Sequence, residues 1–176
     1  MFAPILIFPL LGFATASIQI IPGATWTAKG LNQHVQAHGG GIVEISGDSY
    51  WIGENKLNGS AFQSINCYSS TDLVQWTFVN ELLILQSSGD LGPDRVIERP
   101  HVIYNDASGK YVMWMHIDNS SYAEAKAGVA TCSSICGDYT YIGSSQPLGF
   151  QSRDMNVFKG MFSHFLALGE EKSWMK

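Results

Sequence analysis

Charged residues are scarce in this chain of 176 residues. Asp, Glu, Lys and Arg make up 14% of it, whereas an ordinary soluble domain contains about 25%. The 15 acidic residues outnumber the 10 basic ones, the formal net charge is −5, and Lys and Arg form no cluster in the sequence. Binding to a phosphate backbone requires a concentrated positive surface. The composition therefore excludes nucleic acid as an expected partner.

Cysteine is also scarce, and the three cysteines make an odd number. Cys132 and Cys136 lie four residues apart in the segment CSSIC and could close a small disulfide loop in an oxidising compartment. Cys67 would then be a small, buried apolar residue. A zinc site needs more ligands than this spacing supplies, so the sequence indicates no metal ion and no other cofactor.

Long apolar runs are absent except at the N-terminus. The run Phe2–Phe13 is followed by Ala-Thr-Ala, which predicts a secretory signal peptide over residues 1–17 and an extracellular protein. An uncleaved signal anchor is the less favoured alternative, because a membrane span needs about 20 residues. After cleavage we expect no membrane association. Export agrees with two acceptor sequons for N-glycosylation, at Asn58 and Asn119.

Aromatic residues and glycines are plentiful, and they recur in two similar units. Aromatics reach 12% and there are 18 glycines. One unit begins at His38 and the other at Glu98, and each contains four strand-like segments separated by turns or polar loops. The segments are GGIVEI, SYWIGE, INCYSS and WTFV in the first unit, and PHVIYN, KYVMWMHI, AGVATC and YTYIG in the second. A third opening, SRDMNVF, begins at Ser152. The sequence therefore predicts an all-β fold made of four-stranded antiparallel units.

Repeats of about 60 residues indicate the blades of a β-propeller, although the period is somewhat long for one. The first strand of each blade lines the central channel of a propeller. Glu98 and Asp154 lie where successive units begin, so we expect both side chains to face one pocket that binds a polar ligand. The alternative is that both are strand-end residues in ordinary ion pairs with Arg99 and Arg153. Periodicity alone does not choose between the two.

Several motifs, taken in order, resemble one enzyme family. They are HGGGI, YWIGE, NCYSSTDLVQWTF, ERPHVIYNDASGKYVMWMHIDNSSYAEAKAGVAT and PLGFQSRDM, and they extend from about Gln36 to Lys159. They are similar to the fungal branch of glycoside hydrolase family 43 that contains secreted exo-β-1,3-galactanases. The resemblance implies a five-bladed β-propeller, of which this chain would hold about two blades and the first strand of a third. It also implies an inverting hydrolase acting on terminal galactose of β-1,3-galactan or arabinogalactan, with calcium as an optional ion.

The resemblance assigns roles to individual residues. Asp154 matches the aspartate that orients the general acid and raises its pKa. Glu98 matches an acidic residue that holds sugar hydroxyls, and Glu54 and Tyr122 match positions in the same pocket. Arg153 is expected to pair with Asp154. Three tryptophans on regular strands, by contrast, are expected to pack between blades: Trp51, Trp76 and Trp114.

Two departures from the family pattern limit what is expected of this chain. The step HGGGI has no aspartate to act as catalytic base, and His38 there is either a base or a structural residue. After Lys159 the family pattern ends, so the general-acid glutamate is expected to be missing, because Glu170 and Glu171 do not match it. We expect a hydrolase that is inactive as it stands or, alternatively, a non-catalytic galactose-binding fragment or pseudoenzyme.

The expected domain layout follows from these matches. Residues 1–17 form the signal peptide, residues 18–37 a lead-in, and residues 38–160 the first blades. Residues 161–176 form an atypical tail that does not belong to the family fold. The strand NVF, residues 156–158, is therefore expected to be an unpaired sheet edge.

Overall fold

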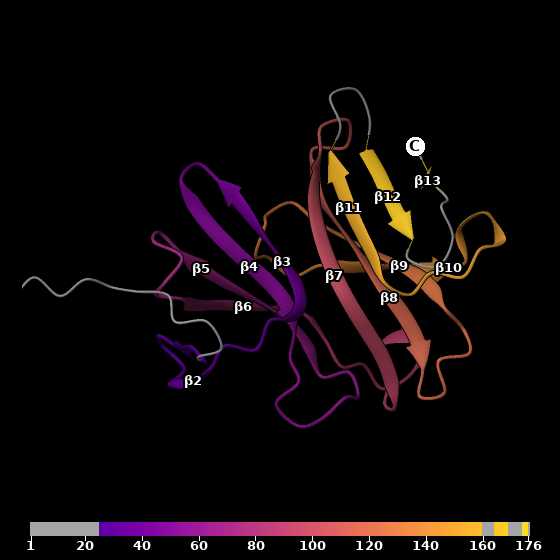
Figure 1. The fold of residues 1–176 in the computed structure, drawn as a ribbon, viewed down its shortest axis with the longest axis horizontal. Coiled ribbons are helices and arrows are strands. Elements are labelled where there is room, and N and C mark those ends of the chain that lie inside the picture. Colours follow the sequence, from indigo (N-terminus) through magenta and orange to yellow (C-terminus); the bar gives the residue numbers. More distant parts are fainter. Residues whose placement is uncertain (1–24, 160–163, 169–173, 176) are drawn as a thin grey trace, which may run out of the picture.

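A computed structural model describes residues 25–159, 164–168 and 174–175 of the chain (Figure 1). The predicted signal peptide, together with Glu170 and Glu171, lies outside these residues. The described part contains only two short 3₁₀ turns besides strands, η1 (Gly89–Leu91) and η2 (Pro147–Gly149). None of its helical segments is long and apolar enough to cross a membrane.

The first sheet is a four-stranded antiparallel meander. Its order is β3-β4-β5-β6, and its strands are β3 (His38–Ile45), β4 (Asp48–Glu54), β5 (Ser64–Ser70) and β6 (Thr77–Ile84). A two-residue turn joins β3 to β4, and both of its residues, Ser46 and Gly47, have positive φ. Such a turn matches the right-handed twist of the paired strands.

The second sheet repeats the same order of strands. Its members are β7 (Arg95–Asn105), β8 (Lys110–Asn119), β9 (Lys126–Cys132) and β10 (Thr140–Ser145), each paired with its sequence neighbour. The all-β class and the two four-stranded units are thus confirmed. One boundary differs from the prediction, because β7 begins three residues before Glu98. The residues with which the second unit was predicted to begin therefore form a bulge inside a long strand.

Further strands extend the fold at both ends. A small hairpin, β1 (Thr27–Ala28) and β2 (Gln33–His34), precedes the first sheet. A three-stranded sheet, β11 (Met155–Lys159), β12 (His164–Leu168) and β13 (Trp174–Met175), follows the second. The expectation of an unpaired NVF edge is wrong, since β11 pairs with β12 along its whole length. Residues beyond Lys159, which do not match the family motifs, thus supply two strands that pair in one sheet with β11.

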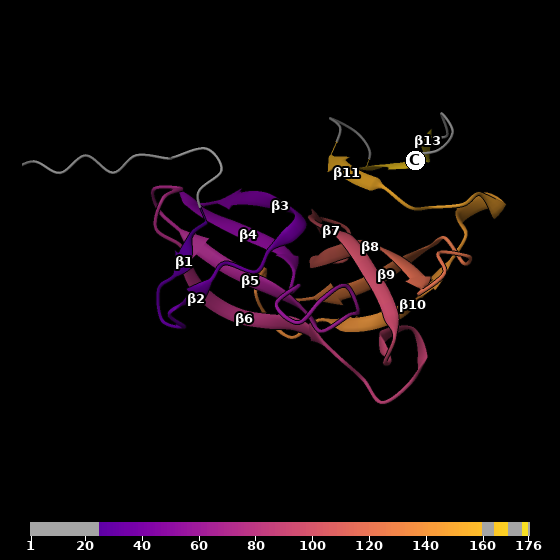
Figure 2. The same cartoon turned by 60° about the horizontal axis from the view of Figure 1, so that its bottom comes forward.

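The three larger sheets follow one another in chain order, and their first strands lie on the same side of the molecule. Figure 2 shows β3, β7 and β11 near one another, with β6 and β10 on the opposite side. Strand β7 contacts both β3 and β11. The first strands therefore bring residues from three sheets to one place, while the fourth strands are kept at the periphery.

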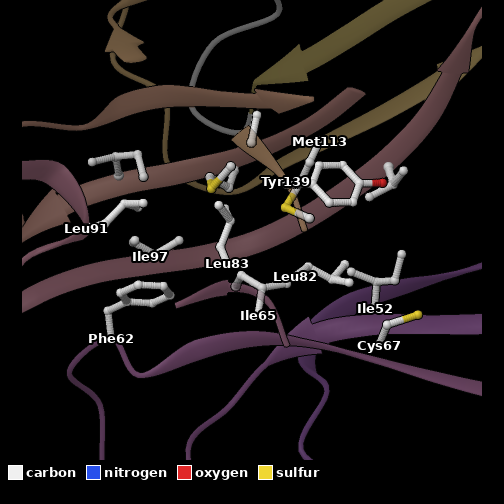
Figure 3. Close-up of a cluster of buried hydrophobic side chains, with 14 residues drawn as sticks. Ile52, Phe62, Ile65, Cys67, Leu82, Leu83, Leu91, Ile97, Met113 and Tyr139 are labelled. Carbon is white, nitrogen blue, oxygen red and sulfur yellow. The ribbon is translucent and has the colours of Figure 1, made fainter. Parts of the chain in front are cut away.

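The main core lies between the first and second sheets. Apolar side chains from both sheets interdigitate there (Figure 3), and the buried members are Ile52, Phe62, Ile65, Cys67, Leu82, Leu83, Leu91, Ile97, Val102, Met113, Met115, Ile117, Ala130 and Tyr139. Burial of this surface is the main stabilising contribution. It fixes the two sheets face to face.

Two smaller clusters contain the tryptophans. Trp51 and Trp76 stack edge to face, with ring centroids 5.2 Å apart, in a cluster that also includes Ala28 of the β1–β2 hairpin. Trp114 packs against Met155 and Val157 of β11. The tryptophans thus pack between sheets or under the hairpin, where they serve as core residues.

A disulfide joins the two main sheets. It links Cys67 of β5 to Cys136 in the loop before β10, with a Cα–Cα distance of 5.8 Å, and leaves Cys132 as a half-buried thiol. The predicted Cys132–Cys136 loop is therefore wrong. The β9–β10 loop lies against the first sheet, where Asn80 Nδ2 donates a hydrogen bond to the carbonyl of Cys136. The spacing of the cysteines along the sequence could not reveal that Cys67 lies next to Cys136.

Removal of this disulfide by the double change Cys67→Ala and Cys136→Ala should lower the free energy of unfolding. The bridge closes a loop with a sequence separation of 69 residues, for which chain entropy predicts a loss of about 4 kcal/mol. Urea unfolding measures it, and Cys132→Ala is the matched control. A non-reduced peptide map that linked Cys132 to Cys136 would contradict the assignment.

Candidate functional site

The first strands of the two main sheets carry a bulge at the same position. The pairing of β3 with β4 shifts between His38 and Gly41, and that of β7 with β8 shifts between Glu98 and His101. The segments HGGG and ERPH are thus equivalent in the two repeats. A bulge redirects the side chains beside it and is frequent near functional sites.

Arg99 in the second bulge has an unusual backbone conformation. Its φ is 54°, although it is not glycine and precedes Pro100. The residue before a proline normally has extended backbone, and a left-handed conformation costs roughly 1–3 kcal/mol. Two contacts hold it: its backbone N–H donates to Glu54 Oε1 at 3.0 Å, and its Nε donates to Asp154 Oδ1 at 2.7 Å. Arg99 thereby joins the first sheet to the residue that precedes β11.

The glycine step of β3 makes room for this arginine. Gly39 has a φ of 60°, and a Cβ atom there would lie 2.6 Å from Glu54 Oε1 and 2.9 Å from Arg99 Nη1. A side chain at this position would push against both partners of the contact. Packing against Glu54 and Arg99 thus explains the first glycine of HGGGI, whereas a Cβ atom at Gly40 would lie 1.7 Å from the carbonyl oxygen of Ile52.

Glu54 is the buried centre of this ion network. Its side chain is 2% exposed, and its Oε2 lies 2.7 Å from Lys56 Nζ. The same ammonium group lies 3.8 Å from Glu98 Oε1. His38 is exposed at the rim, with its Nδ1 3.7 Å from Glu54 Oε1. The attraction of Lys56 and the hydrogen bond from the backbone N–H of Arg99 offset part of the cost of burying this carboxylate.

Glu98 is surrounded by donors. Tyr122 donates its hydroxyl to Glu98 Oε1 at 2.9 Å, and His116 Nδ1 lies 3.5 Å from Oε2. Hydrogen bonding to His116, together with Tyr122 and the charge of Lys56, lowers the pKa of Glu98 to about 2, although partial burial acts in the opposite direction. Burial and the bond to Glu98 raise the pKa of Tyr122 to about 12. At neutral pH the site therefore presents a carboxylate and a phenol.

The structure brings all four predicted site residues into one network. Glu98 and Tyr122 are directly bonded, and Lys56 connects Glu98 to Glu54. The Arg99 contacts connect Glu54 to Asp154. Their roles toward a ligand stay predictions. The network joins residues of the three sheets whose first strands, β3, β7 and β11, lie near one another (Figure 2).

The partner predicted for Asp154 is wrong. Asp154 pairs with Arg99, whereas Arg153 donates to the side chain of Gln151 and to the carbonyl of Tyr122. The ion-pair alternative is therefore correct in part, since Asp154 is both paired and next to the network. Its side chain is 75% exposed, so it is accessible to a ligand.

Sequence reasoning missed three polar members of the network, Lys56, His116 and Asp118. His116 and Asp118 alternate in the segment MHID, and Lys56 follows Glu54 at the same interval. Alternate residues of a strand face the same side, so this spacing was the available signal for His116 and Asp118, whereas Lys56 lies beyond the end of β4. Within the described residues no group of His, Cys, Asp or Glu has the arrangement of a metal site.

Comparison with solved structures gives relatives of high similarity. An exo-β-1,3-galactanase from Phanerochaete chrysosporium, solved with galactose, is 42% identical with a TM-score of 0.82 over 85% of this chain and 36% of its own. A glutamate-to-glutamine variant of that enzyme, solved with β-1,3-galactotriose, gives 41% identity and a TM-score of 0.82 over 86% of this chain and 36% of its own. A Clostridium thermocellum exo-β-1,3-galactanase gives 34% and 0.76 over 85% of this chain and 35% of its own.

The chain spans about a third of the length of these solved structures. No family model matches it, and a search of curated proteins finds no match.

Gly39→Ala should destabilise the fold more than Gly47→Ala. Both glycines have positive φ, but a Cβ atom at Gly47 would meet nothing within 4 Å. The difference isolates the clash with Glu54 and Arg99, and overpacking of this kind costs roughly 1–3 kcal/mol. Urea unfolding of the two variants measures it. An equal loss of unfolding free energy in the two variants would show that glycine is needed at position 39 only for its positive φ.

Glu98 should titrate near pH 2 in the folded chain, as measured by carbon-13 NMR of its carboxyl group. Because its pKa is lowered by folding, its contribution to stability is present above pH ~4.5 and is lost as the pH falls toward 2. Tyr122→Phe removes one donor and should raise this pKa. A wild-type Glu98 that titrated near 4.5 would contradict the described contacts.

Proposed function

This chain belongs to glycoside hydrolase family 43, in the branch of the exo-β-1,3-galactanases, and we propose that its network of Glu54, Glu98, Tyr122 and Asp154 binds the terminal galactose of a β-1,3-galactan. One observation carries the proposal. Residues from three successive sheets converge on a partly exposed carboxylate and a phenol, in a chain similar to an enzyme solved with galactose.

The residues can divide the recognition of a neutral sugar among them. Glu98 is ionised and 21% exposed, so it can accept hydrogen bonds from sugar hydroxyls. Tyr122 is 40% exposed, and its ring can cover an apolar face of galactose. Glu54 is buried beneath them and acts by holding Lys56 and Arg99. Asp154 completes the wall on the side of β11.

The three sheets are proposed to be consecutive blades of a five-bladed propeller. Two complete blades and the sheet of β11 form one part of its funnel, with β3, β7 and β11 as channel-lining strands. The predicted signal peptide agrees with a secreted protein that acts on arabinogalactan outside the cell.

For a complete enzyme that contains this part of the propeller, we propose hydrolysis by an inverting mechanism. It requires a protonated acid and a separate base, with carboxyl groups about 6.5–9.5 Å apart. Asp154 is the proposed modulator of that acid. Within the described residues, however, the pKa values of Glu98 and Asp118 are lowered, and Glu54 and Asp154 are ion-paired. A proton donor needs a raised pKa.

A galactose-binding function without hydrolysis is therefore the form proposed for this chain on its own. Within the described network, Glu98 and Asp118 are set to accept hydrogen bonds and not to deliver protons.

Calorimetric titration of the full chain with galactose should give saturable binding. Glu98→Gln and Tyr122→Ala should each weaken it about tenfold, since each removes a direct contact. Tyr111→Phe is the control, because Tyr111 stacks on Tyr104 away from the network. Release of galactose from β-1,3-galactobiose by the purified chain would contradict the non-catalytic form, and an absence of binding would contradict the pocket.

A further inference from the structure

Asp118 is a buried carboxylate to which the proposed galactose contacts give no role. It lies near the end of β8, and its side chain is fully buried. Each of its oxygens accepts two hydrogen bonds. Oδ1 accepts from the backbone N–H groups of Asn119 and Glu124, at 2.9 and 2.8 Å. Oδ2 lies 3.1 Å from the N–H of Ala125 and 2.9 Å from His116 Nε2.

Three of these four bonds fix the loop 119–125 that carries Tyr122. The loop contains two non-glycine residues with positive φ, Tyr122 at 55° and Ala125 at 46°. Such conformations persist only where the surroundings impose them. Asn119 Oδ1 adds bonds from the N–H groups of Ser121 and Ala123. The Tyr122 hydroxyl is thereby directed to Glu98.

The fourth bond fixes His116. With Nε2 toward Asp118 and Nδ1 toward Glu98, the imidazole lies between two carboxylates. It is 1% exposed, and its ring centroid is 6.0 Å from that of Tyr122. The groups that face it are therefore Glu98 from β7, Asp118 from its own strand and Tyr122 from the loop, with Lys56 beyond Glu98. Any shift of the ring would change the hydrogen bonding of Glu98.

We propose that Asp118 is a positioning residue for the galactose pocket, acting through His116 on Glu98 and through the loop 119–125 on Tyr122. The inference rests on the proposed function of that pocket. Asp118 itself has no exposed surface with which to touch a sugar. Its effect on the ligand is the simultaneous placement of the carboxylate and the phenol.

The chemistry requires a carboxylate at this position. Although burial acts to raise the pKa of Asp118, hydrogen bonds from the loop N–H groups and from His116 lower it. An asparagine has one acceptor oxygen and one donor group in the same space. With its oxygen at the Oδ1 position it would keep the bonds to Asn119 and Glu124. It would place an NH₂ group against the N–H of Ala125, which cannot pair with it, and against His116 Nε2, which could then bond to it only as an acceptor.

The test compares Asp118→Asn with Asp90→Asn in the full chain. Asp90 is a matched control, because its carboxylate also accepts several bonds, from the hydroxyls of Tyr141 and Ser144 and from Arg95. Asp118→Asn should weaken galactose binding about tenfold in calorimetry, whereas Asp90→Asn should leave it unchanged. Equal affinities of wild type and Asp118→Asn would overturn the proposal.

Nitrogen-15 NMR of the His116 ring gives a readout that needs no ligand. Asp118→Asn and Glu98→Gln should each shift the ring signals, and Asp90→Asn should not. If wild type fails to bind galactose, the proposed function falls, and the NMR result alone decides the inference: unshifted ring signals in both variants overturn it. If Asp118→Asn does not fold, His116→Gln replaces it in the titration, and an unchanged galactose affinity overturns the proposal.

Discussion

The contact made by Arg99 is the constraint on which the rest of the site depends. One residue with a strained backbone donates its N–H to a buried glutamate of the first sheet and its guanidinium to the aspartate that precedes β11. Apolar packing holds the first and second sheets face to face, but it does not specify how their first strands are aligned. The charged network supplies that alignment, since each carboxylate must meet its own donor. In a chain with few charges, a large share of them is used here.

The repeated bulge explains why one unit has glycines where the other has charge. Gly39 and Arg99 occupy equivalent positions, and the arginine side chain fills the space that a side chain at Gly39 would need. The two repeats are therefore complementary at this position. The first repeat supplies a glycine, which leaves space, and the buried carboxylate of Glu54. The second repeat supplies Arg99, whose side chain occupies that space.

Much of this arrangement could be predicted from sequence, and what could not has a common cause. Alternating strands separated by glycine turns are local signals, so both four-stranded units were predicted, and motif resemblance gave Glu54, Glu98, Tyr122 and Asp154. The partner of Cys67, the partner of Asp154 and the pairing of β11 are contacts between distant segments, which local patterns do not encode. His116 and Asp118 were missed because polar residues at alternate positions of a strand usually face solvent. The sequence does not show that these two are buried and paired.

The disulfide has a consequence for how the chain would respond to mechanical load. Glu98, His116, Asp118 and Tyr122 all lie within the segment that Cys67 and Cys136 enclose, whereas Glu54 and Asp154 lie outside it. Tension applied at the two ends would pass through the sulfur–sulfur bond and bypass the enclosed segment. Stretching would therefore pull Glu54 and Asp154 away first, while the enclosed half of the pocket stayed unloaded until the bridge was reduced.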